Sequence, residues 1–315
     1  MLKKKNARLA GSVTREDYWL EIQKELRSMK SLTEIFSPSI KSLALSQNGI
    51  ILKYEVVDSI SIQLELDSED IRSAPFTILS EGYYELFESK ILLNIAKDAK
   101  LFFDIGANVG FYSIAASAIN QNLKIMCFEP NPNCFGQLQR NMEINASYIS
   151  IKQIMVNNFA LGEREESGMK FFVPKFTGTG GGSFKNLHPE EGIASEIIVG
   201  SSTLDLFTSS PLSVDLMKID VEGSELSVIK GGLETIQRDR PTIFIELLRK
   251  WMAPFGHHPQ DVLDLLFIEG YECYGIGENS LRKIEFIDEN SRETNYIFCH
   301  PHRKSHLKSV RENIL

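Results

Sequence analysis

Residues 101–110 read Leu-Phe-Phe-Asp-Ile-Gly-Ala-Asn-Val-Gly, and this stretch decides the fold. An apolar run of strand length ends near Asp104, and a glycine-containing turn leads into an apolar segment of helical character, 109–119. A strand, a glycine turn and a helix in that order place backbone beside a ligand at the carboxyl edge of a parallel sheet. The stretch therefore predicts the first strand and the ligand-binding turn of an α/β domain.

The alternation of strand and helix continues along the chain from this point. It predicts seven strands, over residues 101–105, 124–128, 151–157, 214–219, 242–247, 271–276 and 295–299. Helices are expected over residues 109–119, 133–145, 224–237 and 259–268. This order favours a doubly wound α/β fold with a mostly parallel seven-stranded sheet, whose last strand, if it follows a hairpin, runs antiparallel.

The chain before this domain has a different pattern. Residues 14–35 favour an amphipathic helix, and residues 51–57 and 60–66 favour the two strands of a hairpin. We therefore expect an N-terminal helix and β-hairpin extension over 1–80, the α/β domain over 81–305 and a tail over 306–315.

An insertion separates the third and fourth predicted strands, at residues 162–202. It contains Gly178 and the run Gly180-Gly181-Gly182. So many glycines in five residues indicate a flexible segment or a close approach of backbone to another group. Both a surface hairpin loop and a lid over a substrate fit this composition.

Composition narrows the class of protein. The 315 residues include 43% hydrophobic residues and carry a net charge of −8, which counts against a nucleic-acid partner because an acidic surface repels phosphates. The four cysteines contain no CxxC pair, which favours buried free thiols in a reducing compartment. No secretory signal opens the chain and no apolar run approaches 18 residues. We expect a cytoplasmic protein without a membrane span, in an oligomeric state that the sequence leaves open.

Two carboxylates flank the glycine turn. Asp104 ends the first strand, where it can hold the amino group of an amino-acid-like ligand, and Glu129 ends the second strand, where it can accept hydrogen bonds from ribose hydroxyls. A dinucleotide site instead has glycine at the position of Asn108, where a side chain crowds the pyrophosphate. S-adenosylmethionine (SAM) has no phosphate and carries a sulfonium and an ammonium, so this acidic turn favours SAM.

Three alternatives remain open at this stage. The chain could be an NAD(P)-dependent oxidoreductase, or a non-catalytic protein that binds SAM or a nucleotide. Asp104 could also merely cap the next helix.

Four ordered segments resemble the FkbM-type methyltransferases. They are residues 103–110, 128–132, 203–205 and 218–225, and the likeness extends to 228–231 and 241–246. The resemblance covers roughly residues 80–300 and implies a class I, Rossmann-like, SAM-dependent methyltransferase that releases S-adenosylhomocysteine. Such enzymes often methylate oxygen on glycans or secondary metabolites, so the resemblance implies a small-molecule or glycan acceptor. It also implies that residues 158–161 border the adenine and that Glu85 reaches the amino-acid end of the cofactor.

The predicted cofactor-binding residues are therefore Glu85, Asp104, Gly106, Asn108, Gly110, Glu129, Pro130, Asn158 and Ala160.

The acceptor side is predicted at the ends of the fourth and fifth strands. Enzymes that methylate base amines typically have Asn/Asp-Pro-Pro-aromatic after the fourth strand, whereas this chain has Asp220-Val-Glu-Gly, which favours an oxygen acceptor. An aliphatic hydroxyl needs a base or a metal. The candidate catalytic residues are Asp220, Glu222, Glu246 and His257.

Each candidate also has a structural interpretation. Asp220 could shape its loop, Glu222 could lie in the first turn of a helix, Glu246 could orient Lys218 and His257 could belong to a capping turn. Asp220 and Glu222 could together bind a divalent metal, but no spaced Cys or His pattern supports a metal site. We therefore predict no metal ligand.

Overall fold

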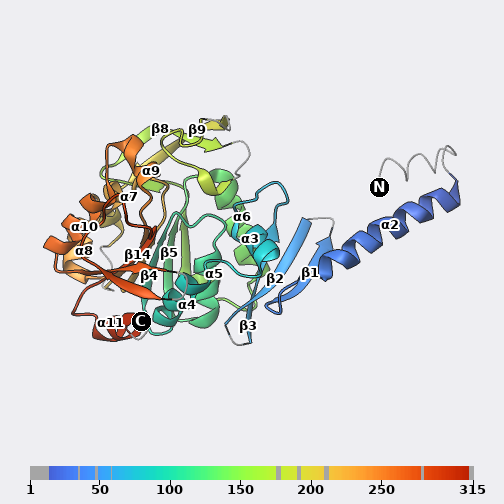
Figure 1. Ribbon diagram of the computed structural model, residues 1–315, viewed down its shortest axis with the longest axis horizontal. Coiled ribbons are helices and arrows are strands. Elements are labelled where there is room, and N and C mark those ends of the chain that lie inside the picture. Colours follow the sequence, from blue (N-terminus) through green and yellow to red (C-terminus); the bar gives the residue numbers. More distant parts are fainter. Residues whose placement is uncertain are drawn as a thin grey trace.

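The structure is a computed structural model that describes residues 14–34, 36–46, 49–57, 59–174, 179–189, 193–208, 213–277 and 280–311. Figure 1 shows a rounded body built around one large sheet, from which helix α2 (Arg15–Thr33) projects to one side. The small sheet next to α2 joins it to the body.

The large sheet has eight strands within the described residues. Their order is β13 (Leu281–Ile284), β12 (Glu272–Ile276), β14 (Asn295–Cys299), β11 (Thr242–Glu246), β10 (Leu216–Ile219), β4 (Leu101–Ile105), β5 (Lys124–Phe128) and β6 (Ile154–Asn157). The strands from β11 to β6 are parallel, and β14 runs antiparallel to both of its neighbours. The doubly wound, mostly parallel sheet is confirmed, as is its antiparallel last strand.

Strand β13 is the addition that the sequence analysis missed. It forms an edge hairpin with β12, and only its two end residues, Leu281 and Ile284, are buried. A four-residue strand with two charged residues at its centre does not stand out from a loop in the sequence.

Helices cover both faces of the sheet. They are α3 (Ala74–Glu81), α4 (Leu86–Ala96), α5 (Phe111–Ile119), α6 (Pro132–Ile144), α7 (Glu225–Lys230), α8 (Leu233–Asp239), α9 (Arg249–Met252), α10 (Pro259–Ile268) and α11 (Lys304–Arg311). Phe102 of β4 belongs to the apolar cluster formed with α4, α5 and α6, whereas Phe103 belongs to the cluster formed with α7 and α10. Because successive strand residues point to opposite faces, a strand buried on both sides is mostly apolar, as β4 is apart from Asp104.

The single helix predicted over 224–237 is wrong, because α7 and α8 are separate helices. The chain bends between them at Gly231 and Gly232. A Cβ atom on Gly231 would lie 1.9 Å from the carbonyl oxygen of Gly162, so backbone approaches too closely there for any larger residue.

The N-terminal extension forms its own antiparallel sheet. The predicted hairpin is present as β2 (Gly49–Val57) and β3 (Ile60–Leu66), and β1 (Ile40–Ser46) adds a third strand on the far side of β2. Alternate residues of β3, Ile62 and Leu64, are fully buried in the same cluster as α5 and α6. The extension therefore shares a core with the α/β domain.

Amide side chains of α6 and its C-cap complete the free edge of β3. Asn145 accepts a hydrogen bond from the Gln63 N–H (2.8 Å) and donates to the Gln63 carbonyl (2.5 Å). One turn earlier, Asn141 accepts from the Glu65 N–H (2.7 Å), and Gln137 donates to the Glu65 carbonyl (2.8 Å). These side chains take the place of a neighbouring strand and so satisfy the backbone of a sheet edge.

Replacing Asn145 with leucine is expected to destabilise the protein by about 2–4 kcal/mol. The substitution leaves the N–H and the carbonyl of Gln63 without partners in a partly buried contact. Urea unfolding of the two proteins gives the difference directly. The exposed Asn122→Leu variant serves as the control and should change the free energy of unfolding by less than about 0.5 kcal/mol; equal effects of both changes would contradict the role of Asn145.

The insertion contributes two strands to a third sheet, whose order is β7 (Ala160–Leu161), β9 (Ile193–Ser202) and β8 (Glu166–Pro174). Strand β7 directly precedes the insertion. Strands β8 and β9 make an antiparallel hairpin at the top of the body in Figure 1. Short 3₁₀ segments complete the described chain: η1 (Ile151–Gln153), η2 (Thr179–Gly181), η3 (Leu204–Phe207) and η4 (Ala253–Phe255).

All four cysteines are buried thiols, as predicted. None of the helices within the described residues combines the length and apolarity needed to cross a membrane.

Candidate active site

A cavity of about 310 Å³ opens at the carboxyl ends of β4, β5, β10 and β11. Its volume is in the range typical of ligand pockets. The structure brings most of the predicted site residues to its wall: Glu85, Asp104, Gly106, Asn108, Glu129, Pro130, Ala160, Asp220, Glu222 and Glu246. Gly110, Asn158 and His257 are not among the lining residues.

The glycine turn brings the ends of two strands together. Gly106 has a φ of +81°, and a Cβ atom there would lie 1.8 Å from the carbonyl oxygen of Asp220. The N–H groups of Gly106 and Ala107 both donate to the carbonyl of Phe128. Glycine is required at position 110 for a packing reason, because a Cβ atom there would lie 2.2 Å from Leu138 of α6.

Asp104 is buried beneath this turn, with only 1% of its surface exposed. The Ser113 hydroxyl of α5 donates to its Oδ2 at 2.5 Å. Burial raises the pKa of Asp104, while the nearby Lys218 ammonium and the Ser113 hydrogen bond oppose the shift. Asp104 does not cap α5, because Gly110 is the N-cap residue and no side chain accepts a hydrogen bond there.

Glu129 lies on the other side of the turn. Its Oε2 accepts the N–H of Asn108 and its Oε1 accepts the N–H of Asn131, each at 2.8 Å. Burial raises the pKa of Glu129 to about 7, although these two hydrogen bonds favour the ionised form. Asn158 supports the segment from outside the cavity by donating to the Glu129 carbonyl at 2.9 Å.

Glu85 reaches the cavity from the residue before α4. The Tyr112 hydroxyl donates to its Oε2 at 2.5 Å, and burial raises the pKa of Glu85 while Lys218 lowers it. Lys218 is a site residue that the sequence analysis did not select. Its Nζ lies 2.7 Å from Oδ2 of Asp220 and 5.0 Å from the centre of the Tyr112 ring.

Lys218 remains a cation in this setting. Burial alone lowers the pKa of its ammonium, but the carboxylates of Asp220, Glu85 and Asp104 raise it by more. The sequence did contain a signal for Lys218. Alternate residues of a strand point to the same face, so residue 218 lies on the same side as the predicted site residue Asp220.

Three of the predicted catalytic residues form a compact carboxylate cluster. Asp220, Glu222 and Glu246 each place one oxygen within 4.8 Å of the other two. Burial raises the pKa of Glu222 and of Glu246 well above the usual range, and the charge of Asp220 adds to both shifts. Glu222 has a φ of +51° in the turn after β10 and precedes α7, so the first-turn carboxylate of that helix is Glu225 instead.

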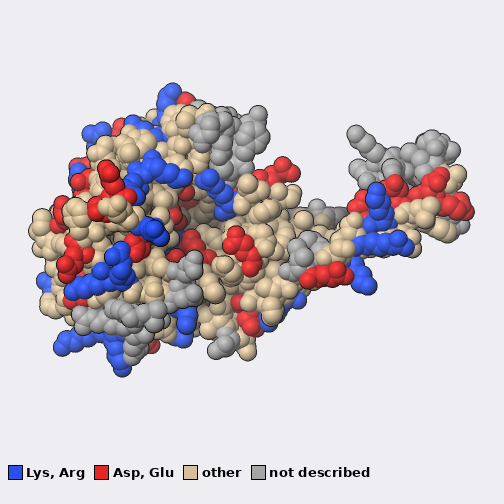
Figure 2. Space-filling model, viewed as in Figure 1, with Lys and Arg blue, Asp and Glu red and all other residues tan. Residues whose placement is uncertain are grey.

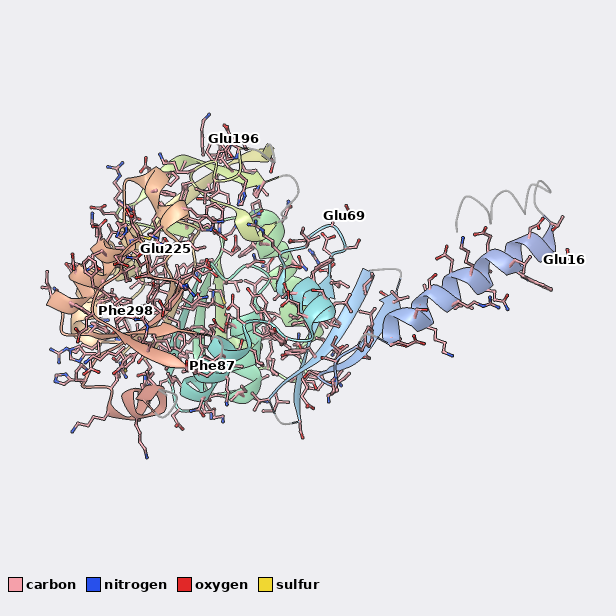
Figure 3. The ribbon with its side chains drawn as sticks, viewed as in Figure 1. Glu16, Glu69, Phe87, Glu196, Glu225 and Phe298 are labelled. Carbon is pink, nitrogen blue, oxygen red and sulfur yellow. The ribbon has the colours of Figure 1, made fainter. Side chains whose placement is uncertain are left out.

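Glu225 lies behind the cluster. Figure 3 shows it inside the body, whereas Glu16 stands at the outer end of α2, and Glu69 and Glu196 lie at the surface. The Oε1 atom of Glu225 accepts the N–H of Gly223 at 2.9 Å, and this hydrogen bond fixes the turn that carries Glu222.

The structure does not bring His257 to the cavity. Its ring stacks on Phe255 with 6.4 Å between centroids, and burial lowers its pKa. The neighbouring His258 caps α10 by accepting the N–H of Gln260. This pair matches the capping-turn interpretation of the sequence.

Two segments far apart in the chain also line the cavity, and the sequence indicated only the glycine-rich one. Arg72, from the extension, lines it together with Gly180 and Gly182 of the insertion. The Arg72 Nη1 lies 3.3 Å from Nε2 of His188. The glycine-rich segment therefore lies at the cavity, as a lid would, while Gly178 falls outside the described residues.

The Rossmann-like sheet, the glycine turn and the acidic cavity at its carboxyl edge define a class I methyltransferase domain. The chain belongs to the FkbM methyltransferase family, whose model, the methyltransferase FkbM domain, matches residues 104–273.

Similar proteins include Methyltransferase 1 of Beauveria bassiana, 26% identical over 150 residues, which are 42% of this chain and 59% of that protein. Methyltransferase sdnD of Sordaria araneosa is 27% identical over 183 residues, 50% of this chain and 68% of that protein. The hexuronic acid methyltransferase AglP of Haloferax volcanii is 25% identical over 178 residues, 56% of this chain and 65% of that protein. The chain thus spans about three fifths to two thirds of the length of these relatives.

Among solved structures, methyltransferase FkbM from Methylobacillus flagellatus is similar, with a TM-score of 0.41 and 17% identity. That match covers 64% of this chain and 44% of the other.

Proposed function

We propose that the protein is a SAM-dependent O-methyltransferase that acts on a hydroxyl of a sugar, a glycan or a secondary metabolite. The observation that carries this proposal is the pair of buried carboxylates, Asp104 and Glu129, on either side of the Gly106 turn. Carboxylates suit a cofactor that carries a sulfonium and an ammonium.

The backbone supports SAM over a dinucleotide. The N–H of Asn108 already donates to Glu129, so it is not available to a phosphate at the turn. Asp104 and Glu85 would bind the ammonium of the cofactor, and Glu129 would accept from the ribose hydroxyls through its remaining lone pairs. Pro130 and Ala160 line the part of the cavity in which the adenine would lie.

In the catalytic step, the protein would mainly align the reactants and remove a proton from the acceptor. SAM supplies an activated methyl group when it is bound. The cavity would align the acceptor oxygen with that group, and alignment can contribute roughly 7–11 kcal/mol. Asp220, with Glu246 beside it, would take the hydroxyl proton as the new C–O bond forms and the C–S bond breaks. Lys218 would hold Asp220 in place through their 2.7 Å ion pair.

A small acceptor fits the charge of the molecule better than a nucleic acid does. The net charge is −8, and on the face seen in Figure 2 acidic and basic side chains are interspersed over the body and along α2. One relative is a hexuronic acid methyltransferase, which supports a sugar acceptor.

Calorimetric titration with S-adenosylhomocysteine and, in parallel, with NAD⁺ tests the cofactor. We expect one-to-one binding of S-adenosylhomocysteine and none of NAD⁺; the reverse result would reject the proposal. A screen of sugar and metabolite acceptors with methyl-labelled SAM then tests the acceptor class, with label on a product oxygen as the expected result.

The affinity for S-adenosylhomocysteine is expected to fall by about tenfold from pH 8 to pH 6. The ribose hydroxyls need the ionised form of Glu129, whose pKa lies at about 7, so acid favours the form that binds less well. Calorimetry across this pH range provides the measurement. The Glu129→Gln variant should bind more weakly at pH 8 and show a flat profile; a flat profile in the unaltered protein would contradict the role of Glu129.

A further inference from the structure

The carboxylate cluster of Asp220, Glu222 and Glu246 gathers three acidic groups beside a single ion-paired ammonium, that of Lys218. The three groups come from the end of β10, the turn after it and the end of β11, and their oxygens meet within 4.8 Å at the cavity wall. Like charges this close, and partly shielded from water, repel one another strongly. All three groups can therefore be ionised together only beside a further positive partner.

Lys218 supplies only part of that charge. Its ammonium pairs with Oδ2 of Asp220, and among the described residues no ion pair joins Glu222 or Glu246 to a cation. The Arg72 guanidinium acts on Glu222 only from a greater distance. One ammonium therefore faces three carboxylates.

An unpartnered oxygen gives independent evidence. The Oε2 atom of Glu222 is fully buried, and no described group donates a hydrogen bond to it. Three residues along the chain, Glu225 is 2% exposed and its Oε2 is likewise buried without a partner. Because nearly all buried polar atoms have partners, two such carboxylate oxygens in one turn indicate that the site is completed by a cation.

We propose that Asp220, Glu222 and Glu246 bind one divalent cation, Mg²⁺ or Mn²⁺, on the acceptor side of the cavity. A ligand set made only of oxygen atoms suits these hard cations, whereas zinc sites usually include nitrogen or sulfur. Three carboxylate oxygens leave coordination positions for water and for an acceptor oxygen.

The consequence for catalysis rests on the function proposed above. A cation beside the acceptor would lower the pKa of a hydroxyl that it contacts. The acceptor proton would then leave more readily to a neighbouring carboxylate or to water, and the cation would also fix the position of the acceptor oxygen. Ionised carboxylates that hold a cation would thus help to activate and position the acceptor, whereas neutral, protonated carboxyl groups would bind no cation.

Mn²⁺ is the probe for the test, because free Mn²⁺ is measured directly by its electron paramagnetic resonance signal. Metal-free, full-length protein is titrated with Mn²⁺ in the presence and in the absence of S-adenosylhomocysteine. We expect one saturable Mn²⁺ per chain, displaced by excess Mg²⁺. Asp220→Asn and Glu246→Gln should each weaken binding at least about tenfold, and the exposed Glu234→Gln should leave it unchanged.

Two outcomes would overturn the site: no saturable Mn²⁺ binding by the folded protein, or equal affinity in the unaltered protein and in both cluster variants. Circular dichroism identifies a variant that fails to fold. If one cluster variant is unfolded, the Mn²⁺ affinity of the other is compared with that of the unaltered protein. Calorimetry with S-adenosylhomocysteine is scored separately. A protein that binds this ligand but no Mn²⁺ retains the proposed function without the metal, and one that binds Mn²⁺ but no S-adenosylhomocysteine loses the proposed function instead.

Discussion

Replacing Asp104 with asparagine is expected to weaken the binding of S-adenosylhomocysteine by roughly 30- to 150-fold, or about 2–3 kcal/mol. The change keeps the shape of the side chain but removes the charge that would face the ligand ammonium. Asp104 is almost completely buried, so little water is present to replace the lost interaction. Titration calorimetry at constant pH measures the loss.

Two further variants separate ligand binding from folding. Asp98→Asn, an exposed carboxylate before the same strand, should leave the affinity unchanged. Ser113→Ala removes the hydroxyl that donates to Asp104 at 2.5 Å and should have a smaller effect in the same direction. An affinity in Asp104→Asn equal to that of the unaltered protein would reject the proposed binding mode.

The second large effect is expected at Asp220. Asp220→Asn should slow methyl transfer by about 10²–10⁴-fold, the usual contribution of a positioned base, while the affinity for S-adenosylhomocysteine changes little. The reason is that the acceptor is proposed to bind beside the carboxylate cluster to which Asp220 belongs. Single-turnover transfer of a labelled methyl group to the acceptor found in the screen separates this step from product release.

Normal turnover in Asp220→Asn would remove both the base and the metal-binding role of this residue. A rate that falls together with the cofactor affinity would instead show that Asp220 shapes the turn at Gly106, whose position depends on the Asp220 carbonyl. His257→Ala is the matched control, because His257 lies away from the cavity, and it should keep its activity.

Much of the architecture was predictable because its cause is local. Strands buried on both faces are apolar runs, and the order of strand, glycine turn and helix appears directly in residues 101–119. The cofactor candidates Asp104, Gly106 and Asn108 lie within one turn, and Glu129 ends the adjacent strand. Parallel strands end at one edge of the sheet, so their terminal residues must lie near one another wherever the rest of the chain runs.

The predictions that failed concern weak local signals. Strand β13 has charged residues at its centre, and the break between α7 and α8 depends on the contact of Gly231 with Gly162, far away in the sequence. Strand β1 was missed for a similar reason, because only Ile40 is buried among its residues.

Local sequence pattern thus determined the doubly wound fold and the acidic turn at its edge. Both depend on residues that are close together in the sequence, namely the apolar runs of buried strands and the turn that follows the first of them. The tertiary structure alone decided which distant groups meet. It places one carboxylate oxygen of Glu246 within 4.8 Å of one of Glu222, and it brings Arg72 of the extension to the same cavity wall as the insertion. It also pairs the α6 amides with the edge of β3. Such contacts depend on how sheet edges and loops pack in space, and the spacing of residues along the chain carries no information about that packing.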